Sequence, residues 1–304
     1  MTPKTLAITG ATGFVGTHLR QQALAAGHQV RALTRRPQAP HPGLVWVPGA
    51  LDDAVSLDRL IEGADAVLHV AGVVNAPDRA GFVAGNITGT DAVIAAAQRS
   101  GAPRFVHVSS LAARHPDLSV YGWSKAEAEA RVAQSGLDWV MVRPPWVYGP
   151  GDLDTLDMFR MAKSGFVLVP PEGAVSLIHA EDLSRLLLTL AAPGLAQGAI
   201  LEVDDNAREG WTNRRVAHAI AEAVGRSALV LATPRPVLRL GARLDRLFRG
   251  DKAKLTSDRV SYFCHPDWRI DPAKRPDPAL WLPEIETKAG LRATAQSYRA
   301  AGML

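Results

Sequence analysis

Tyr121 and Lys125 stand four residues apart in Tyr-Gly-Trp-Ser-Lys, within a stretch whose pattern predicts a helix over residues 121–135. Residues at i and i+4 share one face of a helix. A free tyrosine titrates near ~10, and a nearby ammonium lowers its pKa by favouring the phenolate. Acid–base chemistry on a substrate hydroxyl needs a group with a pKa near the working pH. The pair therefore indicates proton transfer by Tyr121, assisted by Lys125.

Ser110 follows the predicted strand 104–109 and precedes Tyr121 by eleven residues. Its hydroxyl could hold the carbonyl or alkoxide oxygen that Tyr121 protonates. Each residue alone has an ordinary alternative, because Tyr–Lys pairs are common on solvated helix faces and serines are common after strands. Only the combination predicts a catalytic set of Ser110, Tyr121 and Lys125.

Three glycines spaced three apart lie between a predicted strand, residues 5–9, and a predicted helix, residues 15–26. The first permits a tight turn, the second lets the backbone approach a pyrophosphate, and the third lets the helix pack closely on the strand. The helix N-terminus then offers free N–H groups to phosphates. An ordinary glycine-rich turn is the alternative. The residues predicted to bind a dinucleotide here are Gly10, Thr12, Gly13, Phe14, Val15 and Gly16.

The end of the second predicted strand, residues 29–34, bears on which dinucleotide binds. Enzymes that use NAD usually carry Asp or Glu there for the ribose hydroxyls. This chain has Arg35 and Arg36 instead, and no carboxylate. Two guanidinium groups can bind a 2′-phosphate through charge-assisted bonds. The sequence thus favours NADP(H) over NAD(H), the alternative being that the arginines face solvent.

Short apolar runs alternate with amphipathic stretches through the first two-thirds of the chain. Such alternation predicts parallel crossovers and a doubly wound α/β sheet of the Rossmann type. We expect a dinucleotide-binding domain over residues 1–150, with a return strand near 199–203. Residues 151–304 are expected to form a smaller, mainly helical substrate lobe, partly interleaved with the first. Within it, residues 236–250 predict an amphipathic basic helix for which a solvated face, an anionic substrate and a membrane surface all stay open.

Composition excludes several classes of protein. The chain has 304 residues, 47% of them hydrophobic, and a net charge of +4, which is too small to indicate nucleic-acid binding. The single cysteine, Cys264, allows no intrachain disulfide, and the nine histidines show no metal-ligand spacing. No apolar run approaches the ~20 residues that span a bilayer, so no integral membrane contact is expected. The N-terminus lacks the features of a signal peptide, which predicts a cytoplasmic protein.

Together these motifs resemble the extended, epimerase/dehydratase-like branch of the short-chain dehydrogenase/reductase superfamily, near its compact, atypical members related to the 39 kDa subunit of respiratory complex I. The resemblance runs nearly end to end. The matching segments are Thr9 to Gly16, Asn86 to Thr90, Ser110, Tyr121 to Lys125, Arg143-Pro144, Tyr148 to Asp152 and Ile178 to Leu183.

The resemblance implies roles for particular residues. Tyr121 would be the general acid/base, Lys125 its activator and ribose anchor, and Ser110 the partner of the substrate oxygen. Ala71 and Gly72 would lie along the cofactor, Pro144 and Val147 under the nicotinamide, and Leu51 at the adenine. Many relatives have Asp where this chain has Ala50, which removes one bond to the adenine. Asn86 precedes a helix predicted over residues 87–100, and we expect it to cap that helix; a part in the proton relay, as in other branches of the superfamily, is the alternative.

The sequence favours an NAD(P)-dependent oxidoreductase that moves a hydride between nicotinamide and a hydroxyl or carbonyl carbon of a small-molecule substrate. An NAD(P)-dependent epimerase of the sugar-nucleotide type remains open because it shares the first step. A non-catalytic NADP(H)-binding sensor or assembly protein is the third possibility. A homodimer is an expectation from the resemblance alone.

Overall fold

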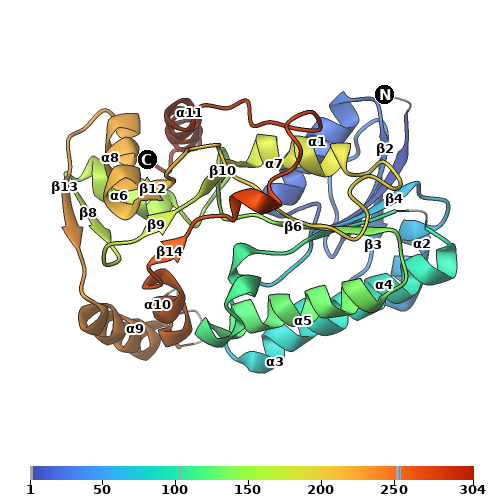
Figure 1. Cartoon of the computed structure of the whole chain (residues 1–304), viewed down its shortest axis with the longest axis horizontal. Helices are drawn as coiled ribbons and strands as arrows, with labels where there is room; N and C mark the ends of the chain where they lie inside the picture. The colour runs from blue at the N-terminus through green and yellow to red at the C-terminus, as the bar shows by residue number, and fades with distance from the viewer. Residues whose placement is uncertain (1–2, 103, 251–252, 254) are drawn as a thin grey trace. The chain divides into compact units, whose positions relative to one another are not determined.

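The computed structural model describes residues 3–102, 104–250, 253 and 255–304. It comprises two compact units, each formed from several stretches of the chain. The first unit contains residues 1–143, 183–202 and 274–281, and the second contains residues 144–182, 203–273 and 282–304. Figure 1 shows the path of the chain through its helices and strands.

A seven-stranded sheet forms the centre of the first unit, with the order β3-β2-β1-β4-β5-β6-β11. Every neighbouring pair is parallel. Reversal of the strand order at β1 and β4 makes the sheet doubly wound, and ligands of such sheets bind at the strand carboxyl ends. The strands are β1 (Thr5–Thr9), β2 (Gln29–Thr34), β3 (Leu44–Pro48), β4 (Ala66–His69), β5 (Phe105–Val108), β6 (Trp139–Arg143) and β11 (Ile200–Glu202).

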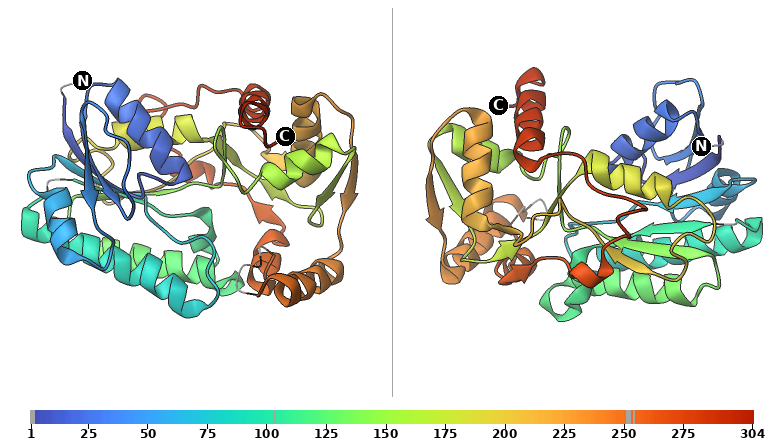
Figure 2. Two further views of the ribbon diagram at one scale, coloured as in Figure 1. Left: turned by 180° about the vertical axis from the view of Figure 1, so that it is seen from behind. Right: turned by 45° about the horizontal axis from the view of Figure 1, so that its top comes forward.

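Helices cover both faces of this sheet. In Figures 1 and 2, α2, α4 and α5 run along one face, and α1 lies on the other. All residues of β4 and β5 are buried, as expected for parallel strands covered on both faces. The helices of this unit are α1 (Phe14–Ala25), α2 (Ala54–Ile61), α3 (Arg79–Phe82), α4 (Gly89–Ser100) and α5 (Val120–Gln134), with α7 (Ala180–Thr189) beginning in the second unit.

The second unit is mainly helical and holds three small sheets with the orders β10-β7, β12-β9-β14 and β13-β8. Its core includes Phe159, Ile220, Leu291 and Tyr298 from three of its helices. The helices are α6 (Leu156–Lys163), α8 (Asn213–Val224), α9 (Arg235–Arg249), α10 (Ser257–Phe263) and α11 (Thr287–Ala300). The strands are β7 (Trp146–Tyr148), β8 (Phe166–Val169), β9 (Ala174–Val175), β10 (Leu177–His179), β12 (Trp211–Thr212), β13 (Leu229–Ala232) and β14 (Asp267–Trp268).

One helix is longer than the sequence predicts. The helical segment expected from Ile87 begins at Arg79 and reaches Ser100 through a π-helical stretch, Val83–Thr88. The side chain of Asp78 caps its start by accepting from the Gly81 N–H. Asn86 therefore lies inside the helical segment, and its predicted capping role is wrong. No helix among the described residues is long and apolar enough to cross a membrane.

Candidate active site

The glycine-rich turn after β1 is tightly packed, which explains two of its three glycines. Gly10 has a φ of 71°, and a Cβ there would lie 2.7 Å from the Ala71 nitrogen. A Cβ on Gly16 would lie 2.0 Å from the Gly10 carbonyl oxygen. No larger residue fits either position without movement of the backbone. The turn therefore holds the start of α1 close to the ends of β1 and β4.

The N-terminus of α1 is open. Gly13 is its N-cap and provides no side chain to bond the first N–H groups. Thr12 and Gly13 are exposed, and Phe14 and Val15 are half-buried. Uncapped N–H groups and the positive end of the helix dipole form a site for phosphate. Together with the close-packed glycines, this arrangement fits a dinucleotide pyrophosphate.

Two exposed arginines follow the carboxyl end of β2. The buried Thr34 shapes this turn, because its hydroxyl donates to the Arg36 carbonyl oxygen at 2.6 Å and lies 3.3 Å from the Arg36 N–H. Arg35 and Arg36 are both exposed. β2 pairs with β1 in parallel register, so the arginine pair and the glycine turn lie at the same end of the sheet.

Lys125 lies at the meeting point of β4, β5 and α5. Its Nζ donates to the Val108 carbonyl oxygen at 2.8 Å, and the residue is 4% exposed. A Cβ on Gly72 would lie 3.7 Å from this Nζ and 3.3 Å from the Asn86 Oδ1. The structure thus brings Gly72, after β4, into the immediate neighbourhood of the predicted catalytic lysine.

Asn86 joins the loop after β4 to α5. Its Oδ1 accepts from the Val73 N–H at 2.6 Å, and its Nδ2 donates to the Val73 carbonyl at 2.9 Å. The same Nδ2 donates to the Ser124 hydroxyl at 2.9 Å. Asn86 is 2% exposed, so it fixes backbone beside Lys125 and is not placed to cap a helix. The sequence motif from Asn86 to Thr90 drew attention to Asn86, but it did not predict these hydrogen bonds to Val73 and Ser124.

Burial sets the charge of the groups around Lys125. It lowers the pKa of Lys125 to about 8, against the opposing effect of the Glu129 carboxylate. Burial also lowers the pKa of His69 to about 3, and the Lys125 charge acts in the same direction. The His69 ring lies between the hydroxyls of Thr9, at 2.7 Å, and Thr90, at 3.0 Å. A neutral, hydrogen-bonded histidine therefore supports the strands below the lysine, a feature that the sequence analysis missed.

Ser110 and Tyr121 lie on elements that pack together. Ser110 begins a short 3₁₀ helix, Leu111–Arg114, and its Oγ accepts from the Ala112 N–H at 3.2 Å. Ser119 caps α5, which places Tyr121 in the first turn. Gly122 lets this turn approach the 3₁₀ helix, because a Cβ there would lie 2.7 Å from the Ala112 carbonyl oxygen. The ring of Tyr121 is half-buried, 6.3 Å from that of Phe82.

A buried ionic network lies beside the predicted catalytic serine. The Ser109 hydroxyl donates to Glu129 at 2.5 Å, and Arg143 pairs with Glu129 at 2.6 Å and with Glu202 at 3.3 Å. Arg143 is 9% exposed, Glu129 6% and Glu202 0%. Removing Arg143 would deprive the buried Glu129 carboxylate of its salt-bridge partner, which is strongly destabilising. The network links the residue that follows β5 to β6, β11 and α5, next to Ser110.

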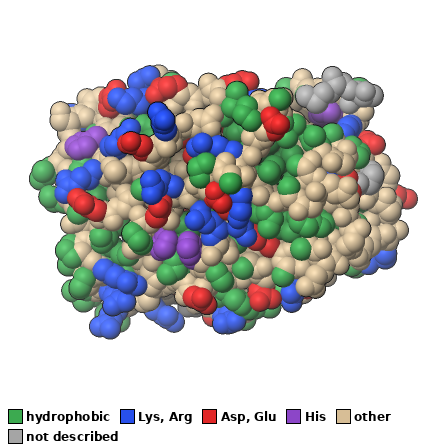
Figure 3. All heavy atoms as spheres, viewed as in Figure 1, with side chains coloured by type: hydrophobic (Ala, Val, Ile, Leu, Met, Phe, Trp, Pro, Cys, Tyr) green, Lys and Arg blue, Asp and Glu red, His purple; other side chains and the backbone are tan. Residues whose placement is uncertain are grey.

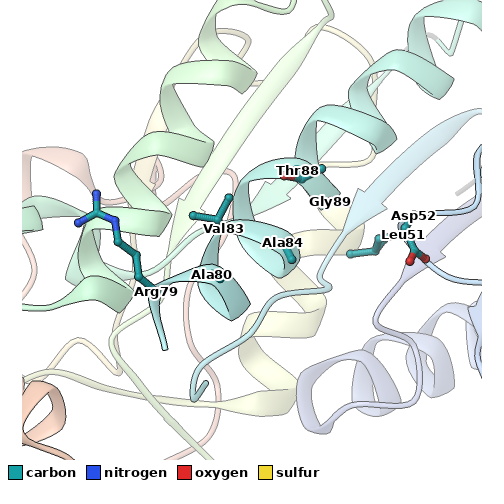
Figure 4. A pocket seen from close by; sticks show the side chains of 8 residues that line it. All are labelled: Leu51, Asp52, Arg79, Ala80, Val83, Ala84, Thr88 and Gly89. Atoms are coloured by element: carbon teal, nitrogen blue, oxygen red, sulfur yellow. The ribbon is translucent and has the colours of Figure 1, made fainter. Parts of the chain in front are cut away.

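A cavity of about 480 Å³ opens between the loop after β3 and the segment from α3 to α4. Figure 4 shows Leu51 and Asp52 on one side and Val83 and Ala84 on the other. Leu51, predicted to lie at the adenine, is therefore in a cavity wall. The lining residues are Leu51, Asp52, Arg79, Ala80, Val83, Ala84, Thr88 and Gly89.

Pro144 and Val147 belong to the second unit. Val147 lies in β7, opposite Ile178 of β10. The other predicted site residues all belong to the first unit.

Comparison with known proteins supports this architecture. A family model described as NAD(P)H-binding matches residues 10–158. Ceramide reductase of Caulobacter vibrioides is 34% identical, over 98% of this chain and 96% of its own. The chain belongs to the NAD(P)H-binding short-chain dehydrogenase/reductase family. Like its relatives of the extended branch, this family member is an NAD(P)-dependent enzyme of the oxidoreductase/epimerase type.

More distant relatives cover the chain equally well. The 2-alkyl-3-oxoalkanoate reductase of Stenotrophomonas maltophilia is 29% identical, over 96% of this family member and 99% of its own chain. Among solved structures, the Bordetella bronchiseptica enzyme WbmG in complex with NAD and UDP superposes with a TM-score of 0.77, at 20% identity, covering 99% and 96% of the two chains. That structure supports the fold alone.

Proposed function

We propose that this protein is an NADPH-dependent reductase of a ketone on a long-chain lipid. The match to ceramide reductase carries the proposal, because it extends over 98% of the chain and so includes the second unit. A second relative is named for a 3-oxo acid with an alkyl substituent. Both names describe carbonyl or hydroxyl chemistry beside alkyl chains. A sensor that only binds the cofactor would not need the predicted catalytic set of Ser110, Tyr121 and Lys125, all of which are present.

In this proposal the bound cofactor supplies a hydride to the carbonyl carbon. Tyr121 gives the proton that the carbonyl oxygen needs as it becomes a hydroxyl. Lys125, held by the Val108 carbonyl, stabilises the phenolate that remains and anchors the ribose. Ser110 donates to the oxygen during the reaction. Hydride and proton together account for the two hydrogens gained by the ketone.

The preference for NADPH rests on Arg35 and Arg36. Both are exposed at the carboxyl end of β2, at the same sheet end as the glycine turn. A 2′-phosphate can accept charge-assisted hydrogen bonds from both guanidinium groups. In this proposal the adenine binds in the cavity beside Leu51. Ala71 and Gly72 lie along the bound cofactor. We propose, as the family resemblance implies, that Pro144 and Val147 lie under the nicotinamide.

The test is NADPH consumption by the purified protein with two substrates, ceramide oxidised to its ketone and UDP-glucose. The proposal expects net oxidation of NADPH with the lipid ketone only. It also expects the reaction with NADH to be much slower. Conversion of UDP-glucose without net change in the cofactor would overturn the proposal in favour of an epimerase. Tight NADPH binding without oxidation of NADPH by the lipid ketone would also overturn the proposal.

A further inference from the structure

Helix α9 presents a continuous apolar stripe to solvent. Five large apolar side chains on it are exposed, at i, i+3, i+7, i+10 and i+11, and this spacing places them on one face of a helix. Phe248 is 81% exposed and Leu247 77%. Contiguous apolar side chains that are this exposed commonly mark a surface that binds a protein partner or a membrane. Its members are Val237, Leu240, Leu244, Leu247 and Phe248.

The helix packs on its protein through a different face. Ala242 is 2% exposed, and Leu238 is half-buried. A Cβ on the neighbouring Gly241 would lie 3.6 Å from the Leu255 side chain. Asp245, the only carboxylate in α9, accepts from the Leu255 N–H at 2.8 Å. The stripe is thus not the surface that attaches α9 to the second unit.

The solvent side of α9 also carries positive charge. Arg239, Arg243 and Arg246 are exposed, at a spacing that places them beside the apolar stripe. The helix holds five arginines against one aspartate. Figure 3 shows Lys and Arg side chains next to hydrophobic ones at the lower left, the region where Figure 1 draws α9.

The strand that leads into α9 also carries exposed apolar side chains. β13 and β8 are paired in parallel, with Leu229 opposite Phe166 and Leu231 opposite Leu168. These four side chains are 41–64% exposed, whereas Val167 and Val230 between them are buried. One face of the two-stranded sheet is therefore apolar and exposed. Only Thr233 and Pro234 separate β13 from α9.

We propose that α9 lies in the plane of a bilayer surface that contains anionic lipid. The apolar stripe would enter the boundary between headgroups and acyl chains, and the arginines would bind lipid phosphates. At 15 residues, α9 is shorter than the ~20 that span a bilayer, so it lies on the surface. The proposal concerns binding to vesicles and is independent of the proposed substrate.

The positive charge of α9 favours an anionic bilayer over a second copy of the chain as the partner of the apolar stripe. A symmetric pair of α9 helices joined through the stripe would bring two rows of arginines together, and like charges in contact disfavour binding. An anionic surface neutralises the same rows. Both features of the helix, the apolar stripe and the adjacent arginines, then serve one interaction.

The experiment is flotation of the full-length protein with two kinds of vesicle, phosphatidylcholine alone and phosphatidylcholine with phosphatidylglycerol. We expect binding to the mixed vesicles, weakened by salt, and at least about tenfold weaker binding to neutral vesicles. Leu247→Asp with Phe248→Asp should lower the bound fraction about tenfold or more, because the apolar insertion is lost. Arg239→Gln with Arg243→Gln and Arg246→Gln should weaken binding about 10–100-fold.

Val55→Asp is the matched control, because Val55 is 60% exposed on α2, outside the second unit. It should bind vesicles as the wild type does. NADPH affinity, measured on each variant, reports that the first unit is folded. Failure of the wild type to bind the mixed vesicles would overturn the proposal. So would a dimer in light scattering that becomes monomeric in the Leu247/Phe248 variant without any vesicle binding.

Discussion

The two ends of the candidate cofactor site are built in opposite ways. At the end proposed to be catalytic, Lys125 and Asn86 are 4% and 2% exposed, and each makes hydrogen bonds to backbone. At the other end, Arg35 and Arg36 are exposed on a turn after β2. The first arrangement is fixed before any ligand arrives, whereas the second consists of long side chains in water.

We expect this difference to separate the catalytic step from the choice between NADPH and NADH. Buried, hydrogen-bonded groups hold the geometry that proton transfer needs and are little screened by salt. Exposed arginines act through charge, and their effect weakens as ionic strength rises. Substitutions at the two ends should therefore change different measured quantities.

Tyr121→Phe should produce the largest effect. Loss of the proton donor should lower kcat for ketone reduction about 10²–10⁴-fold. NADPH affinity should be unchanged, because the ring remains in place beside Phe82. Steady-state kinetics and calorimetry on the same preparation measure both. Activity retained by this variant would remove Tyr121 from the mechanism.

Arg35→Ala combined with Arg36→Ala should act on affinity alone. Loss of two charge-assisted interactions should raise the Kd for NADPH about 10–100-fold. The Kd for NADH should stay within about twofold of the wild type, since NADH carries no 2′-phosphate. An equal loss for both cofactors would show that the arginines do not distinguish them.

The lowered pKa of Lys125, about 8, predicts a pH dependence. Above this pH the lysine loses its charge, so the rate of reduction should fall about tenfold per pH unit. Between about 8 and the ordinary 10.5, the unfolded chain binds more protons than the folded chain. The free energy of unfolding, relative to Lys125→Met, should therefore rise with pH over that window. A rate that stays constant to pH 10 would contradict this role.

Salt should have the smallest effect. Raising the ionic strength should weaken NADPH binding a few-fold through screening of Arg35 and Arg36. NADH binding and kcat should change less, because Lys125 and Asn86 are buried. Titrations of both cofactors at low and high salt make the comparison. A salt effect of the same size on kcat would remove the contrast between the two ends.

Local spacing explains what the sequence predicted well. The glycine triplet and the Tyr–Lys pair each lie within one strand–turn–helix unit or one helix, so their geometry follows from short-range rules. The predicted strands 5–9, 29–34 and 104–109 agree with β1, β2 and β5 to within one residue at each end, because buried parallel strands are continuous apolar runs. The doubly wound sheet followed from this alternation.

Long-range partners explain what the sequence did not reveal. Asn86 looked like a cap because the extension of its helix back to Arg79 depends on packing against α5 and on the Val73 backbone. The contacts of Glu129 with Ser109 and Arg143 join residues 14 or more positions apart. The parallel pairing of β8 with β13 was likewise not predicted, since more than 50 residues separate the two strands.

The most direct test of the proposed reaction follows one hydrogen atom. NADPH carrying deuterium at both C4 positions of the nicotinamide is incubated with the purified protein and ceramide oxidised to its ketone. We expect one deuterium on the new carbinol carbon with wild-type protein, and a rate about 10²–10⁴-fold lower with Tyr121→Phe. Unlabelled alcohol, or label that stays on the cofactor while the ketone persists, would contradict it.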